Sequence, residues 1–170
     1  MLSKESFLDR DLISIYDLSI QEINFILDLA KDVKLNEGAF SKIMAGKIMA
    51  PLFFEASTRT SSSFQAAMLQ LGGNVLDFDA YSSSLKKGET LRDTLKIMGG
   101  YSPDIVVIRH KLDGSASFAA DILKKPVINA GDGQNQHPTQ TLLDLFTIRE
   151  IRGRIEGVKI ALAGDLKYGR

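Results

Sequence analysis

The chain has 170 residues, of which 44% are hydrophobic and 25% are charged, so it fits one globular domain or one domain with a piece of another. Lys plus Arg and Asp plus Glu both count 21, so no overall field favours nucleic acid or a membrane surface as a partner. The absence of cysteine excludes disulfides, thiolate zinc sites and a cysteine nucleophile. No signal-peptide core and no membrane-spanning apolar run is present, and we expect a soluble, cytoplasmic protein.

A helix is the first element predicted along the chain. Ile23, Ile26, Leu27 and Leu29 recur at helical spacing and therefore share one face. Ser19 stands just before this pattern, where serine is a favoured cap of a helix start. We therefore expect the opening helix to begin after Ser19.

Short apolar runs and helical stretches alternate along the rest of the chain. The apolar runs predict buried strands at 47–54, 74–78, 104–109, 126–129 and 158–163. The stretches between them predict helices at 58–71, 89–100, 115–123 and 138–151. This alternation indicates an α/β fold, a parallel sheet with helices on both faces, which binds ligands beyond the carboxyl ends of its strands. The charged segment 149–156, which contains Gly153, is the best candidate for a domain junction.

The segment FFEASTRTSSSF, residues 53–64, predicts an anion site where a strand runs into a helix. A helix start leaves backbone N–H groups without partners and carries partial positive charge. Ser57, Thr58 and Thr60 can therefore surround an oxyanion that Arg59 holds with its planar guanidinium, and phosphate is the natural ligand. The alternative is that Ser57 is only an N-cap and Arg59 only a surface charge.

Three basic residues, Arg109, His110 and Lys111, stand together where the predicted strand DIVVIRH ends, at the edge where this fold binds ligands. Arg109 is the predicted site residue, because it ends the strand. His110 and Lys111 fit a solvated basic edge nearly as well.

The loop NAGDGQNQHPTQ, residues 129–140, leads through glycines to His137, which directly precedes Pro138 in the first turn of a helix. His137 and Gln140 are three residues apart, so both side chains can face one small ligand. One can donate to an oxygen and the other can recognise an amide. The alternative is that His137 is a structural residue, as a single histidine often is.

The loop YSSSLKKGETL, residues 81–91, is polar and carries Lys86 and Lys87 ahead of a helix. On its own it fits an exposed, mobile loop better than a site.

Taken together, these segments resemble the aspartate and ornithine carbamoyltransferases over essentially the whole chain. FFEASTRTSSSF is similar to the carbamoyl phosphate motif, SSSLKKGETL to the lysine loop, VVIRH to the arginine strand and NAGDGQNQHPTQTLLDLFTI to the second substrate loop. HPTQ together with GDLKYGR is similar to the aspartate enzymes, whereas the ornithine enzymes usually carry cysteine in place of Thr139. The resemblance therefore favours aspartate as the acceptor.

The resemblance also implies roles for individual residues. The loop of Ser57, Thr58, Arg59 and Thr60 would hold the phosphate of carbamoyl phosphate. Arg109, His137 and Thr60 would lie by the carbamoyl carbonyl oxygen, and Gln140 would read the carbamoyl amide. Such catalysis works by positioning and charge stabilisation, and it needs no cofactor, metal or protein nucleophile. The departing phosphate can accept the proton of the attacking amine.

Other residues would act only in an assembly or on the second substrate. In the family, Lys87 and a serine, here Ser84 or alternatively Ser83, enter the active site of a neighbouring subunit in a homotrimer, and regulatory chains are further partners. Arg170 matches a residue that contacts aspartate. We therefore expect a carbamoyl phosphate-binding domain at 1–152 and the first strand of a truncated aspartate-binding domain at 153–170.

Because family members continue beyond the position of Arg170, this chain is expected to bind phosphate-bearing ligands weakly and to show no turnover alone. Three other interpretations are an ornithine enzyme, a non-catalytic assembly module and a nucleotide-binding domain. The intact set of candidate residues argues against the assembly module. The chain has neither a GxGxxG turn nor a P-loop lysine motif, which argues against nucleotide binding.

Overall fold

The computed structural model of the chain describes residues 3–79 and 88–164. Within these ranges four strands form one parallel sheet in the order β2-β1-β3-β4. The strands are β1 (Ile48–Phe53), β2 (Asn74–Val75), β3 (Ile105–His110) and β4 (Val127–Asp132). The prediction of an α/β fold with a parallel sheet is confirmed.

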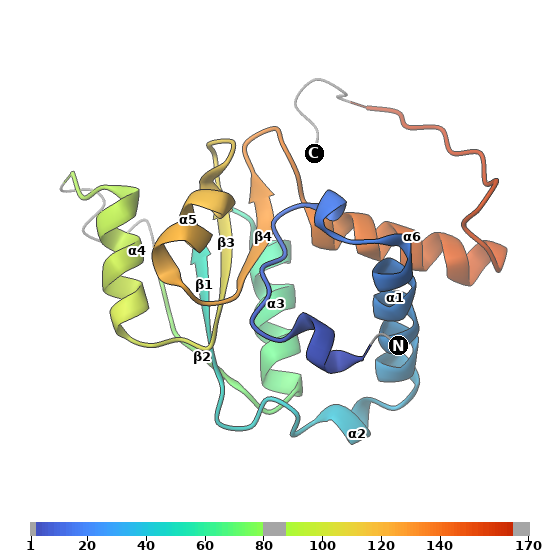
Figure 1. Cartoon of the computed structure of the whole chain (residues 1–170), viewed down its shortest axis with the longest axis horizontal. Helices are drawn as coiled ribbons and strands as arrows, with labels where there is room; N and C mark the ends of the chain where they lie inside the picture. Colours follow the sequence, from blue (N-terminus) through green and yellow to red (C-terminus); the bar gives the residue numbers. More distant parts are fainter. Residues whose placement is uncertain (1–2, 80–87, 165–170) are drawn as a thin grey trace.

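Helices lie on both sides of this sheet (Figure 1). The α-helices are α1 (Ile20–Leu35), α2 (Glu37–Phe40), α3 (Thr58–Gln70), α4 (Leu91–Gly100), α5 (Ser115–Leu123) and α6 (Pro138–Arg152). Two short 3-10 helices, η1 (Lys4–Phe7) and η2 (Ile15–Asp17), precede them. The four long helices predicted after the first strand are confirmed to within two residues at each end, whereas α2, η1 and η2 were not predicted.

The core is divided by the sheet, because successive side chains of a strand point to opposite faces. On one face, Ala50 and Leu52 of β1 pack in the same buried cluster as side chains of α4 and α5. On the other face, Met49 of β1 and Val107 of β3 pack with Met68 of α3. The near-continuous burial of β1 and β3 is what a sheet covered on both faces requires.

The predicted cap of the first helix is confirmed. The Ser19 hydroxyl accepts a hydrogen bond from the Glu22 N–H at 3.2 Å, and the Glu22 carboxylate accepts one from the Ser19 N–H at 2.8 Å. This reciprocal pair satisfies backbone groups that a helix start otherwise leaves without partners. The segment before the helix lies along β4, where the Leu12 N–H donates to the Val127 carbonyl at 2.8 Å.

β2 is shorter than the strand predicted at 74–78, and a proline explains where its pairing ends. The Met49 carbonyl of β1 accepts a hydrogen bond from the Leu76 N–H at 2.8 Å. Alternate residues of β1 face β2, so the next rung would need a donor at Pro51. Proline has no N–H, and the ladder stops there.

The strand predicted at 158–163 is wrong. Within residues 3–79 and 88–164 this segment pairs with no other strand, and its Ile160 and Leu162 side chains are 58% and 78% exposed. An apolar run becomes a strand only where a neighbour accepts its backbone hydrogen bonds. The sequence pattern identified the apolar segment 158–163 but could not show whether another strand lies beside it.

β4 extends through Asp132 and contains an irregularity in its pairing with β3. Ile108 pairs with Asn129 and His110 pairs with Asp132, so three steps along β4 match two steps along β3. One extra residue in one strand is a β-bulge, which bends the strand and redirects its backbone groups. The strand predicted at 126–129 therefore ended too early, within the polar part of β4.

Candidate functional site

The strand order creates a switch point between β1 and β3. The chain leaves β1 towards β2 on one side, while β3 and β4 lie on the other side. Phe53 at the end of β1 pairs with Arg109 near the end of β3. The loop that follows β1 therefore starts beside Arg109, at the position where sheets of this kind bind ligands.

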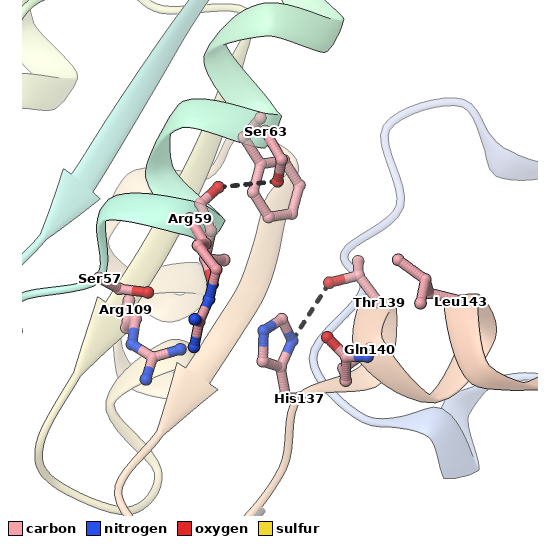
Figure 2. Close-up of a pocket in the computed structure, with 10 residues that line it drawn as sticks. Ser57, Arg59, Ser63, Arg109, His137, Thr139, Gln140 and Leu143 are labelled. Atoms are coloured by element: carbon pink, nitrogen blue, oxygen red, sulfur yellow. Dashed lines mark hydrogen bonds between the residues drawn. The ribbon is translucent and has the colours of Figure 1, made fainter.

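A cavity of about 630 Å³ opens at this position, and three of the four segments singled out in the sequence meet there. Figure 2 shows Arg59 and Arg109 on one side and His137 between them and the start of α6. The lining residues are Ser57, Arg59, Thr60, Ser63, Phe64, Arg109, His137, Thr139, Gln140 and Leu143. Because two guanidinium groups reach the cavity, it favours an anion.

The start of α3 has the form predicted for an anion cradle. Ser57 occupies the N-cap position, but its side chain makes no capping hydrogen bond. Its hydroxyl is therefore not used in closing the helix, which argues against the interpretation of Ser57 as only a cap. Arg59 is exposed and its side chain extends towards Arg109 (Figure 2). Thr58 is exposed and does not line the cavity, unlike Thr60.

Arg109 is fixed by two neighbours. Its Nη1 donates to the Ala130 carbonyl at 3.1 Å, and its Nη2 lies 3.6 Å from Oε1 of Glu55. Only 14% of the Arg109 side chain is exposed. Ala130 lies in the bulge of β4, so the irregular pairing supplies a carbonyl that holds the arginine at the cavity.

His110 and Lys111 do not line this cavity. The His110 ring is buried, packs edge-on against Phe54 with ring centroids 5.3 Å apart, and accepts a hydrogen bond at Nδ1 from the Leu112 N–H at 3.1 Å. Burial lowers the pKa of His110, and the charge of Lys111 lowers it further, while Glu55 opposes both effects. His110 is therefore a structural residue and Lys111 an exposed one.

A buried carboxylate organises the loop before α6, a feature that the sequence analysis missed. Asp132 is 1% exposed. It accepts hydrogen bonds from the Gly114 N–H at 2.8 Å, the Asn129 amide at 2.8 Å, the Asn135 amide at 3.1 Å and the Gln136 N–H at 3.2 Å. These bonds tie β4, the start of α5 and the loop together, and so fix the approach to the residue that caps α6.

The first turn of α6 carries the residues predicted on this loop. His137 is the N-cap and Pro138 follows it at the first helical position. Nδ1 of His137 lies 3.2 Å from the Thr139 hydroxyl, and Nε2 of Gln140 donates to Asp144 at 2.9 Å. The structure therefore brings His137 and Gln140 to one cavity, as predicted.

Four lining residues, Ser63, Phe64, Thr139 and Leu143, were not predicted as site residues. Ser63 lies three residues after Thr60, and Leu143 three residues after Gln140, so each continues the helix face of a predicted residue. Helical spacing was the signal that could have found these two.

Comparison with known proteins identifies the family. The family model for the carbamoyl-P binding domain of aspartate/ornithine carbamoyltransferase matches residues 10–150. The chain belongs to this family. The resemblance stated from the motifs is thereby confirmed.

Several curated relatives of the chain are named as catalytic subunits of aspartate carbamoyltransferase. The chain is 54% identical over 164 residues to an aspartate carbamoyltransferase catalytic subunit of Thermococcus onnurineus, a match that covers 95% of this chain and 53% of the relative. The subunit of Archaeoglobus fulgidus is 54% identical over 165 residues, with coverage of 95% and 54%. The chain thus spans about half the length of the curated relatives it matches.

A solved structure agrees with the fold. Aspartate transcarbamoylase of Trypanosoma cruzi, in complex with carbamoyl aspartate and phosphate, superposes with a TM-score of 0.93 at 40% identity. That match covers all of this chain and 53% of the other.

Some residues predicted from the carbamoyltransferase resemblance lie outside the described residues. These are Ser84, with its alternative Ser83, Lys87 and Arg170, and Lys86 of the polar loop lies outside them too. Within residues 3–79 and 88–164, no group of three or more His, Asp or Glu side chains is placed to hold a metal ion. No helix in the same part of the chain is long and apolar enough to span a bilayer.

Proposed function

We propose that this chain is the carbamoyl phosphate-binding part of an aspartate carbamoyltransferase. The enzyme transfers the carbamoyl group from carbamoyl phosphate to the amine of L-aspartate, giving N-carbamoyl-L-aspartate and phosphate, a step of pyrimidine biosynthesis. The observation that carries the proposal is the convergence of the Ser57–Thr60 loop, Arg109 and His137 on one cavity. Family membership and the relatives named as aspartate carbamoyltransferase catalytic subunits support it.

The phosphate of the substrate would lie at the start of α3. Backbone N–H groups of a first helical turn and the Ser57 and Thr60 hydroxyls are suited to phosphate oxygens, and Thr58 would contribute through its backbone. Arg59 would supply the counter-charge, since its guanidinium reaches the cavity from the same turn.

The carbonyl oxygen of the carbamoyl group would face Arg109, His137 and Thr60. The aspartate amine attacks the carbonyl carbon, a C–N bond forms, and negative charge gathers on this oxygen. Donors fixed before the reaction stabilise that charge, and the fixed position of Arg109 between Ala130 and Glu55 suits this task. The C–O bond to phosphate then breaks, and the departing phosphate takes the amine proton.

Gln140 would recognise the carbamoyl amide. Its Nε2 already donates to Asp144, which turns its Oε1 into the group available to accept from the substrate NH₂. If the Gln140 NH₂ group faced the substrate NH₂ instead, two hydrogen-bond donors would meet and no hydrogen bond could form. The Asp144 contact therefore supports a preference for a carbamoyl over a carboxylate group.

The rest of the enzyme is proposed from the family. The carbamoyl phosphate-binding domain would comprise 1–152, and 153–170 would begin the aspartate-binding domain. Lys87 and Ser84 would complete a neighbouring active site in a homotrimer, and Arg170 would contact aspartate. Regulatory chains and a cytoplasmic setting remain predictions of the same kind.

Calorimetric titration with carbamoyl phosphate tests the donor site in this chain. Arg59→Ala removes a charge-assisted contact and is expected to weaken binding roughly 10- to 100-fold. Arg154→Ala, an exposed arginine outside the cavity, is the matched control and is expected to bind like the unmodified chain. Equal affinity of Arg59→Ala and the unmodified chain, or tighter binding of a dinucleotide than of carbamoyl phosphate, would refute the proposal.

The acceptor needs its own test. The protein isolated from its source is expected to form carbamoyl aspartate from aspartate and no citrulline from ornithine. Product from ornithine alone would overturn the choice of aspartate.

A further inference from the structure

The two ring nitrogens of His137 have different surroundings. Nδ1 lies 3.2 Å from the Thr139 hydroxyl, and the opposite edge of the ring is turned towards the two arginines (Figure 2). A neutral imidazole has one N–H donor and one acceptor nitrogen, so the partner of Nδ1 decides what Nε2 can do.

The Thr139 hydroxyl is placed to donate to Nδ1. It lies in the first turn of α6, and its contact with His137 is its only hydrogen bond among the residues that the structure describes. Pro138 between them is buried and has no N–H of its own. Among these described residues, Nδ1 is therefore the one acceptor paired with the hydroxyl.

We propose that Thr139 is a positioning residue that holds His137 as the Nε2–H tautomer. The Thr139 hydroxyl donates to Nδ1, and Nε2 then presents its N–H to the cavity. That this N–H donates to the carbonyl oxygen of carbamoyl phosphate rests on the proposed function. The assignment of the tautomer is independent of the proposed function.

The opposite arrangement would oppose the binding of an anion in the cavity. If Nδ1 carried the proton, Nε2 would present a lone pair beside Arg59 and Arg109. A lone pair there would repel the oxygen of any anion that the two guanidinium groups attract. The Thr139 contact makes all three groups donors to one ligand.

Nitrogen NMR of the imidazole rings tests this directly, because the chain contains only two histidines, His110 and His137. The two tautomers differ in which ring nitrogen shows the shift of a protonated nitrogen. At a pH well above the ordinary imidazole pKa, His137 is expected to show protonated Nε2 and acceptor Nδ1. His110, whose Nδ1 accepts from Leu112, is the internal standard for an intact fold.

Two substitutions of Thr139 distinguish the effect of its hydroxyl donor from the effect of its side-chain shape. Thr139→Val keeps the branched side chain and removes the donor, so the His137 Nδ1 resonance is expected to move towards the protonated position while His110 stays unchanged. Thr139→Ser keeps the donor and is expected to restore the pattern of the unmodified chain. The Thr139→Val chain should also bind carbamoyl phosphate roughly three- to tenfold more weakly.

Two results would overturn the inference: Nδ1–H on His137 in the unmodified chain, or an unchanged His137 spectrum in Thr139→Val. If Thr139→Val does not fold, as the His110 signals would reveal, Thr139→Ala takes its place in the same comparison. Failure of the unmodified chain to bind carbamoyl phosphate would instead contradict the proposed function, and the tautomer measurement would still decide the role of Thr139.

Discussion

The buried ring of His110 predicts a measurable pH dependence of stability. Burial lowers its pKa below the ordinary 6.5, so the folded chain favours the neutral ring. At a pH well above 6.5, His110 is neutral in both the folded and the unfolded chain. As the pH falls below 6.5, the unfolded chain binds a proton at His110 before the folded chain does. The free energy of unfolding therefore decreases until the pH has passed the lowered pKa of the folded state. An NMR titration should give His110 a midpoint below 6.5.

The substitution His110→Phe keeps a ring against Phe54 and removes the titrating group. The loss of stability on acidification below 6.5 is expected to be smaller in His110→Phe than in the unmodified chain, as measured by denaturant midpoints. A titration midpoint at or above 6.5, or equal acid sensitivity of both chains, would contradict the assignment.

The candidate residues were predictable at this scale, while their partners were not. Arg109 ends an apolar run, and Arg59, His137 and Gln140 lie at the starts of helices that follow such runs, where the fold class places ligands. The partners come from distant positions, such as the Ala130 carbonyl in a bulge, and no local pattern announces a backbone group. Whether Arg109 or the adjacent His110 reaches the cavity can be predicted only when it is known which face of the strand each residue occupies.

At the scale of an element, the cap of α1 has its own acid dependence. The hydrogen bond from Arg10 and those from Ser19 lower the pKa of Glu22 from 4.5 to about 2. The stability that ionised Glu22 contributes is therefore present in full above pH 4.5 and is lost as the pH falls through about 2.

Glu22→Gln should consequently be less stable than the unmodified chain at neutral pH, with a difference that shrinks between pH 4.5 and about 2. Glu156→Gln, which changes an exposed carboxylate in a turn, is the control and should show little difference at any pH. Denaturant midpoints of the three chains measure this. A Glu22→Gln difference that does not depend on pH would show that the carboxylate charge is irrelevant to the cap.

Strand lengths show where element prediction reached its limit. An apolar run reports that a segment is suitable for a sheet, and β1 and β3 were found in this way. Pairing needs a donor and an acceptor on the next strand, and Pro51 removes one of them for β2. The run at 158–163 meets no partner among the described residues and is not a strand.

At the scale of the whole molecule, the site depends on an order of strands that the sequence analysis did not predict. Alternation of strands and helices predicted a parallel sheet, but many orders satisfy that pattern. The order β2-β1-β3-β4 places the ends of β1 and β3 side by side and brings α6 to the same edge. Long-range packing, and not local periodicity, selects that order.

A chimera tests the function of the molecule as a unit. This chain is joined to the part of the Thermococcus onnurineus catalytic subunit that the match leaves uncovered, and carbamoyl aspartate formation is measured. The chimera is expected to be active, its Arg59→Ala variant to lose roughly 10-fold or more in kcat/KM, and Arg154→Ala to keep its activity. The 170-residue chain alone is expected to give no product. Product formation by the chain without the added part, or an Arg59→Ala chimera whose kcat/KM equals that of the unmodified chimera, would contradict this division of labour.

The extra residue in β4 means that a regular ladder and the hydrogen bond that holds Arg109 at the cavity oppose each other in this protein. A shortened β4 that matched β3 step for step would gain an orderly ladder, yet it would carry the carbonyl of Ala130 away from Arg109. A redesign of this backbone for higher thermal stability should therefore leave residues 129–132 unchanged, even though their pairing is the irregular part of the sheet.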